Sequence, residues 1–215
     1  MKVYAVSPLF VVLIGAALPC GFHTRPGRIQ VGLYTTFQYA PPAPVREAAR
    51  EELAAVVTPL GILVHWRPEA DNPSDPWWNR VATIQFIGRC DDSDLRPGPP
   101  HPWVFGQTRV SEGNVIPYAE IHCDPLRAYL APILVSMGQR RRTVVFGRAL
   151  GRVVAHELYH ILAKTRRHGF SGMGKESFTP AELTADEFQF QDEEIQRLRL
   201  VTSPGMPLNC EGSER

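Results

Sequence analysis

A segment in the last third of the chain places the strongest restriction on the fold. Residues from about Thr143 to Lys164 have helical periodicity and include the run RVVAHELYHILA. Most positions of this run are uncharged, which is typical of a helix buried among other elements. We therefore predict a central, buried helix. Gly147 and Gly151, four residues apart, would let a neighbouring element approach it closely, at some cost in helix stability.

Apolar patterns elsewhere predict a small sheet and further helices. Strands are expected at residues 29–34, 61–67, 80–88, 105–110 and 114–123, and helices from Pro44 to before Gly61, over about 125–137, and over 183–199. The last two strands flank Ser111-Glu112-Gly113, which predicts a hairpin. The strand at 61–67 is apolar without a break, as in a strand buried on both faces.

Two local signals refine this arrangement. Pro117 cannot donate a hydrogen bond to a sheet, so the second hairpin strand is expected at the edge. Thr179, Pro180 and Glu182 have the spacing of a capping box that opens a helix. Together the patterns predict an α+β fold in which helices pack on a small mixed β-sheet with an antiparallel edge strand.

The N-terminus indicates export. Lys2 is followed by an apolar stretch, Pro8 to Pro19, which is too short for a membrane helix and typical of a signal peptide. We expect residues 1–20 to be a secretory signal and residues 21–215 to form one domain. The mature protein is then secreted or periplasmic, without a transmembrane helix, and a lipid anchor at Cys20 is the alternative.

Charge and cysteine usage agree with an exported globular protein. Lys and Arg total 23 against 22 acidic residues, a balance that argues against a nucleic-acid partner. Cys90 and Cys123 each close a predicted strand, so a disulfide between them is expected in an oxidising compartment. Two buried free thiols are the alternative. Cys20 and Cys210 lie near the two ends, and their pairing stays open.

The buried helix contains the motif HExxH as His156-Glu157-Leu158-Tyr159-His160. Histidines four residues apart project from one face of a helix, so both imidazoles can reach a single Zn²⁺. Glu157 lies beside the first histidine. There it can take a proton from a metal-bound water and later hand it to a leaving amine.

The run VVAHELYHIL resembles the zincin superfamily of zinc metallopeptidases. The resemblance covers about residues 143–170 and implies a zincin-like domain with His156 and His160 as zinc ligands and Glu157 as general base. It also implies a peptide or protein substrate, aligned along an antiparallel edge strand by backbone pairing. Residues 114–121 are the expected edge strand.

The third zinc ligand departs from the family patterns. In the metzincin pattern HExxHxxGxxH, Ala163 stands in place of the glycine and Arg166 in place of the last histidine. His168 follows eight residues after His160, before a glycine where the chain can turn back, and we expect it to be the third ligand. Glu182 is the alternative, because its spacing to Asp186 matches the gluzincin ExxxD pattern. Met173 lies in SGMG, which predicts a surface turn. A floor beneath the metal, like the methionine turn of metzincins, is the alternative.

The sequence therefore predicts an exported zinc metallopeptidase that hydrolyses peptide bonds through a metal-bound water activated by Glu157. One alternative is a zinc-binding protein of zincin fold that is catalytically silent and acts as an interaction module. Another is an exported domain stapled by a disulfide, without metal. The substrate and the oligomeric state are not predicted.

Overall fold

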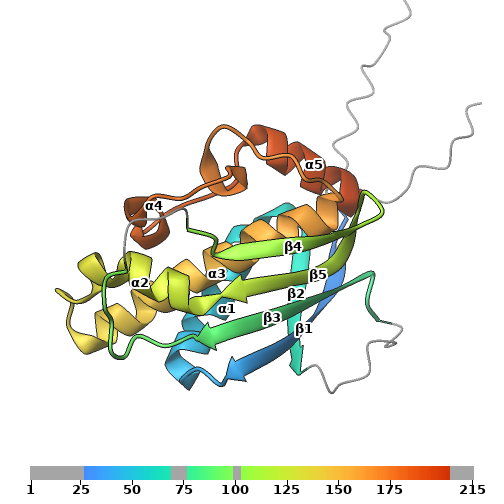
Figure 1. The fold of residues 1–215 in the computed structure, drawn as a ribbon. Coiled ribbons are helices and arrows are strands. Elements are labelled where there is room, and N and C mark those ends of the chain that lie inside the picture. Colours follow the sequence, from blue (N-terminus) through green and yellow to red (C-terminus); the bar gives the residue numbers. More distant parts are fainter. Residues whose placement is uncertain (1–26, 69–76, 99–102, 204–215) are drawn as a thin grey trace, which may run out of the picture.

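The computed structural model describes residues 27–68, 77–98 and 103–203, which form one five-stranded sheet and a set of helices (Figure 1). The strands are β1 (Ile29–Tyr39), β2 (Ile62–Pro68), β3 (Arg80–Arg89), β4 (Gly106–Ser111) and β5 (Asn114–His122). The helices are α1 (Ala43–Val57), α2 (Cys123–Leu134), α3 (Gln139–Ala163), α4 (Pro180–Thr184) and α5 (Asp192–Thr202), with short 3-10 turns at Thr58–Leu60 and Gly172–Gly174. The predicted mixed α+β class is confirmed.

The strand order is β2-β1-β3-β5-β4, and only the β4–β5 pair is antiparallel. The predicted antiparallel edge strand is therefore present, but it is β4, so the expectation that residues 114–121 form the edge is wrong. Pro117 is tolerated inside the sheet because β3 pairs with β5 only from Tyr118 onward. On its other side, Pro117 falls in a register shift of the β4–β5 ladder between Thr108 and Val110.

Two further predictions fail for identifiable reasons. The apolar strand β2 is not buried on both faces, because it forms the other edge of the sheet and exposes His65 and Arg67. The expected helix over 183–199 is interrupted. The capping box of Thr179 and Glu182 is present, but α4 ends after five residues, at Ala185 in an extended conformation. A second capping box, formed by Gln191 and Glu194, starts α5 separately.

The central helix α3 is buried, as predicted, and lies beside α1 against one face of the sheet (Figure 1). The close approach needs both glycines. A Cβ at Gly147 would lie 2.6 Å from the Ala48 Cβ, and one at Gly151 would lie 2.5 Å from the Ala49 carbonyl oxygen. Arg152 is fully buried at this contact, where its Nε donates to Glu52 at 2.6 Å.

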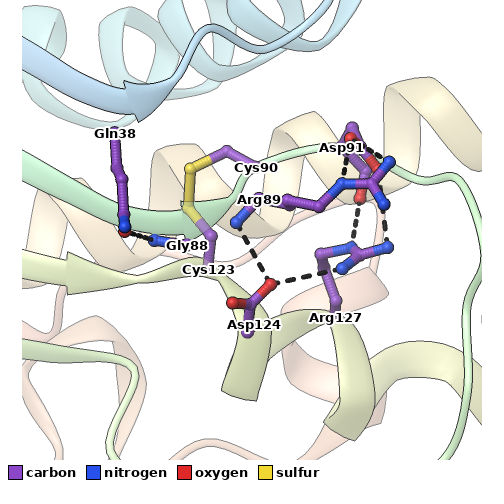
Figure 2. The surroundings of a disulfide bond; sticks show 8 residues. All are labelled: Gln38, Gly88, Arg89, Cys90, Asp91, Cys123, Asp124 and Arg127. Carbon is purple, nitrogen blue, oxygen red and sulfur yellow. Dashed lines mark hydrogen bonds and ion pairs between the residues drawn. A yellow bond between two sulfur atoms is a disulfide. The ribbon is translucent and has the colours of Figure 1, made fainter.

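Cys90 and Cys123 form the predicted disulfide (Figure 2). Parallel pairing of β3 and β5 brings their carboxyl ends together, with Ile87 opposite His122, so the two cysteines that follow are adjacent. Polar contacts surround the bond. Asp124 accepts from the Arg89 backbone N–H at 3.1 Å and from the Arg127 guanidinium at 3.2 Å.

Among the described residues, no helix is both long enough and apolar enough to cross a bilayer. The predicted signal peptide, Cys20 and Cys210 lie outside the described residues.

Candidate metal centre

Three histidines lie together at the C-terminal part of α3. His156 and His160 lie one turn apart on the helix, and His168 comes from the segment that follows it. One ring nitrogen from each of the three lies within 4.8 Å of the others. The two helical histidines are buried and His168 is exposed. Three nitrogen donors with one exposed side are the composition of an open metal site, in which a further ligand position stays accessible.

A tight turn explains how a histidine eight residues beyond His160 joins the group. The helix ends at Ala163, and Lys164 adopts a left-handed conformation with φ 48°. The chain then folds back along the helix. The backbone N–H of Thr165 donates to the His160 carbonyl at 3.2 Å, and the Thr165 carbonyl is 2.8 Å from His160 Nδ1. Thr165 is thus attached to His160 at both of its backbone groups, which aims the next residues toward the histidines.

The hydrogen bonds of the two buried rings fix their tautomers. His156 Nδ1 lies 2.8 Å from the Met173 carbonyl, and His160 Nδ1 lies 2.8 Å from the Thr165 carbonyl. A carbonyl oxygen only accepts, so each Nδ1 carries the proton and each neutral ring keeps a bare lone pair on Nε2. These two Nε2 atoms are 3.0 Å apart. Two lone pairs facing each other at this distance are favourable only with a cation beside them.

Burial keeps the imidazoles neutral. It lowers the pKa of His156 to about 3, helped by the nearby His160, and burial also lowers the pKa of His160. Neutral imidazole is the form that binds metal ions, and Nδ1 bonds to carbonyls hold such ligands in orientation. The donor set therefore fits a transition-metal ion such as Zn²⁺.

Glu157 lies beside this group and contacts the edge strand. The Thr108 hydroxyl donates to Glu157 Oε2 at 2.6 Å. Gly106 makes room for the same carboxylate, because a Cβ there would lie 2.3 Å from Glu157 Oε1. Burial raises the pKa of Glu157 to about 7, and the bond from Thr108 acts against that rise. A carboxylate with such a pKa can both accept and release a proton near neutral pH.

A cleft of about 550 Å³ opens over the three histidines and Glu157. Strand β4 forms one of its walls, and the segment after α3 forms another. The part near the start of β4 is apolar and is lined by Trp103, Val104, Phe105 and Phe178. The site can thus receive an extended chain along β4, with side chains beside the histidines.

Glu182, the alternative third ligand, does not join the histidine group. Its carboxylate accepts two bonds of 2.6 Å from the Lys175 ammonium and caps α4 through Thr179. Asp186, its partner in the ExxxD spacing, pairs with Arg148 at 3.0 Å. Glu182 therefore has a structural role in the described chain, and His168 is the residue that the fold brings to the site.

Met173 differs from the expectation of a surface turn. It is fully buried, and its carbonyl accepts from His156. The sequence also gave no indication of Gly106, Thr108 or the Thr165 carbonyl as parts of the site. Thr108 does lie in the predicted hairpin, but this position points to the site only once β4 is known to be the edge strand.

Comparison of the chain with protein-family models finds no match, and comparison with curated proteins finds no significant match. The function therefore has to be inferred from the residues of the site.

Proposed function

We propose that this protein is an exported zinc metallopeptidase of the zincin type, with His156, His160 and His168 as metal ligands. One observation carries the proposal: two buried, neutral imidazoles face each other through bare Nε2 atoms 3.0 Å apart, with a third imidazole nitrogen close by. The disulfide supports the part of the proposal that the protein is exported, because such bonds persist in oxidising compartments.

The roles of the residues follow from their positions. A bound Zn²⁺ supplies a Lewis acid that polarises a carbonyl and lowers the pKa of water. Glu157 takes the proton of the attacking water and later passes it to the leaving amine. The Thr108 hydroxyl holds one oxygen of Glu157, which leaves the other free for this transfer.

Strand β4 supplies the means to hold a peptide. Within the described residues, β4 pairs with β5 alone, so its outer edge can accept an extended segment as an added strand. Gly106 and Thr108 of this strand contact Glu157. A peptide paired with β4 would therefore carry its backbone carbonyls past the general base.

The proposal is tested first by metal content. Elemental analysis of the purified, zinc-reconstituted protein is expected to find one zinc per chain, and His168→Ala is expected to lose most of it. Glu182→Ala is the matched control, because it removes the alternative ligand and should retain the zinc. Loss of zinc only in Glu182→Ala would overturn the ligand assignment, and absence of zinc from the unaltered protein would overturn the function.

Turnover is tested on the same proteins with a mixture of diverse unstructured peptides, read by mass spectrometry. We expect cleavage that chelation abolishes, and a Glu157→Gln variant that keeps its zinc but does not cleave. Full activity in Glu157→Gln would refute the mechanism. A zinc-loaded wild type that cleaves nothing would instead identify a zinc-binding interaction module.

A further inference from the structure

A second hollow, of about 550 Å³, lies beside the cleft between the β4–β5 turn and the end of α3. Its lining comes from two short segments, 113–115 and 164–167. Val115, Thr165 and Arg166 also line the histidine cleft, so the two hollows adjoin and together make one continuous depression. Figure 1 shows the same neighbourhood, with the turn between β4 and β5 near the end of α3.

The charge of this hollow has one sign. Lys164, Arg166 and Arg167 line it, and no acidic residue does. All three side chains are exposed, and within the described chain none of them forms an ion pair. Arg127 and Arg152, by contrast, are paired with carboxylates.

A structural reason accounts for only part of this cluster. Cations near the end of a helix interact favourably with its dipole, but the effect is confined to the last turn and small when exposed. The three cations also lie next to a site proposed to hold a divalent cation, where they repel it. The backbone that carries them is held there because Thr165 is attached to His160 and accepts from the Arg167 backbone N–H at 3.1 Å. A group of unpaired cations is complementary to an anionic ligand.

The direction of β4 connects this hollow to the site of hydrolysis. The strand starts at Gly106, against Glu157, and runs to Val110, which lies opposite Val115 in the hollow. A peptide paired with β4 would cover this distance at about 3.3 Å per residue, so it would reach the hollow about four residues from the cleaved bond.

We infer that the hollow formed by residues 113–115 and 164–167 binds acidic side chains, and that the substrates are peptides with a block of Asp or Glu about four residues to one side of the cleaved bond. The cleavage part of this inference rests on the proposed function. A nucleic acid is the less fitting partner, because three clustered cations contact too few phosphates in a chain whose net charge is +1.

Binding is tested without turnover, in the Glu157→Gln protein, by isothermal titration calorimetry. The probes are an unlabelled peptide with a block of consecutive aspartates and a twin with asparagines in their place. We expect the aspartate peptide to bind about tenfold more tightly at low salt, and this preference to shrink in about 0.3 M NaCl. Equal affinities for the two peptides at low salt would overturn the inference.

Matched charge variants locate the effect. Lys164→Gln with Arg167→Gln, at two positions that line the hollow but not the histidine cleft, is expected to remove most of the preference for aspartate and leave the affinity for the asparagine twin unchanged. Arg140→Gln with Arg141→Gln removes the same charge from exposed positions at the other end of α3 and should keep the preference. If both double variants lose it equally, a general charge effect is responsible and the hollow is not the binding surface.

Cleavage of the same two peptides by the wild type separates this inference from the proposed function. Cleavage of the aspartate peptide with about tenfold higher kcat/KM supports both. Equal cleavage together with equal binding keeps the peptidase and overturns the acidic preference. Selective binding without any cleavage keeps the acidic-peptide surface and contradicts the proposed peptidase activity.

Discussion

Replacing both Cys90 and Cys123 with alanine should lower the free energy of unfolding by about 4 kcal/mol. The disulfide closes a loop of 33 residues in the unfolded chain. In the chain-entropy treatment a loop of this size corresponds to about 12.5 cal/mol/K, or about 3.7 kcal/mol at 25 °C, and loss of two buried sulfur atoms adds a smaller packing term. For a domain of this size the melting temperature should fall by about 7–15 °C.

Urea unfolding followed by circular dichroism measures this loss, with EDTA present so that metal binding does not contribute. The reductant supplies the control. A phosphine reductant should destabilise the wild type by nearly the same amount and leave the double variant unchanged. A difference below about 1 kcal/mol between wild type and variant, or an equal effect of reductant on both, would refute the argument that this bond restricts the unfolded chain.

Three other outcomes can be measured on the same preparations. Gly151→Ala should lower the free energy of unfolding measured in urea by about 1–2 kcal/mol, because the added Cβ would meet the Ala49 carbonyl, although alanine favours helix. An increase in stability would contradict the close packing of α1 on α3. Burial lowers the pKa of His156 to about 3, so below pH 6.5 this residue binds a proton in the unfolded chain but not in the folded one. Metal-free wild type should therefore lose about 1.1 kcal/mol more stability per pH unit, on average, than His156→Gln as the pH falls from 6.5 to 5. Equal slopes would disprove the neutral buried ring. Thr108→Val should lower kcat about tenfold or more with zinc content unchanged, because the hydrogen bond to Glu157 is lost. Thr108→Ser, which keeps the hydroxyl, should retain activity. An unchanged kcat in Thr108→Val would show that this bond does not position Glu157.

The sequence predicted best those features that depend on local periodicity. The spacing of His156 and His160 fixes them on one face of a helix wherever that helix lies. Likewise, Cys90 and Cys123 close strands whose ends are adjacent once the two strands pair in parallel. The relation between the histidines is set within one helix. For the cysteines, only the position of each one at a strand end is local, and their adjacency also needs the parallel pairing of β3 with β5.

Features that depend on sheet order were not predictable in the same way. Pro117 indicated an edge strand, since a proline lacks one donor. The structure instead places it in a register shift, beyond the point where β3 begins to pair, and no sequence pattern marks that irregularity. The assignment of the edge then moved to β4, and with it the contact between Thr108 and Glu157. The burial of Arg152 was also not predictable, for a different reason. A charged residue inside an apolar helix can be fully buried here because it forms an ion pair with Glu52 of α1, which only the packing of the two helices brings close.

The turn at Lys164 connects the unusual ligand spacing with the basic hollow. If the helix continued past Ala163, residues 164–168 would extend along its axis, away from His156 and His160. The left-handed residue instead folds them back, and Thr165 is attached to His160 through both backbone groups. This geometry carries His168 to the other histidines and leaves Arg166 lining both the cleft and the hollow. The position that holds a histidine ligand in the metzincin pattern therefore lies outside the proposed metal centre and is available to contact a substrate. The spacing of eight residues and the proposed preference for acidic peptides would then have a common structural cause.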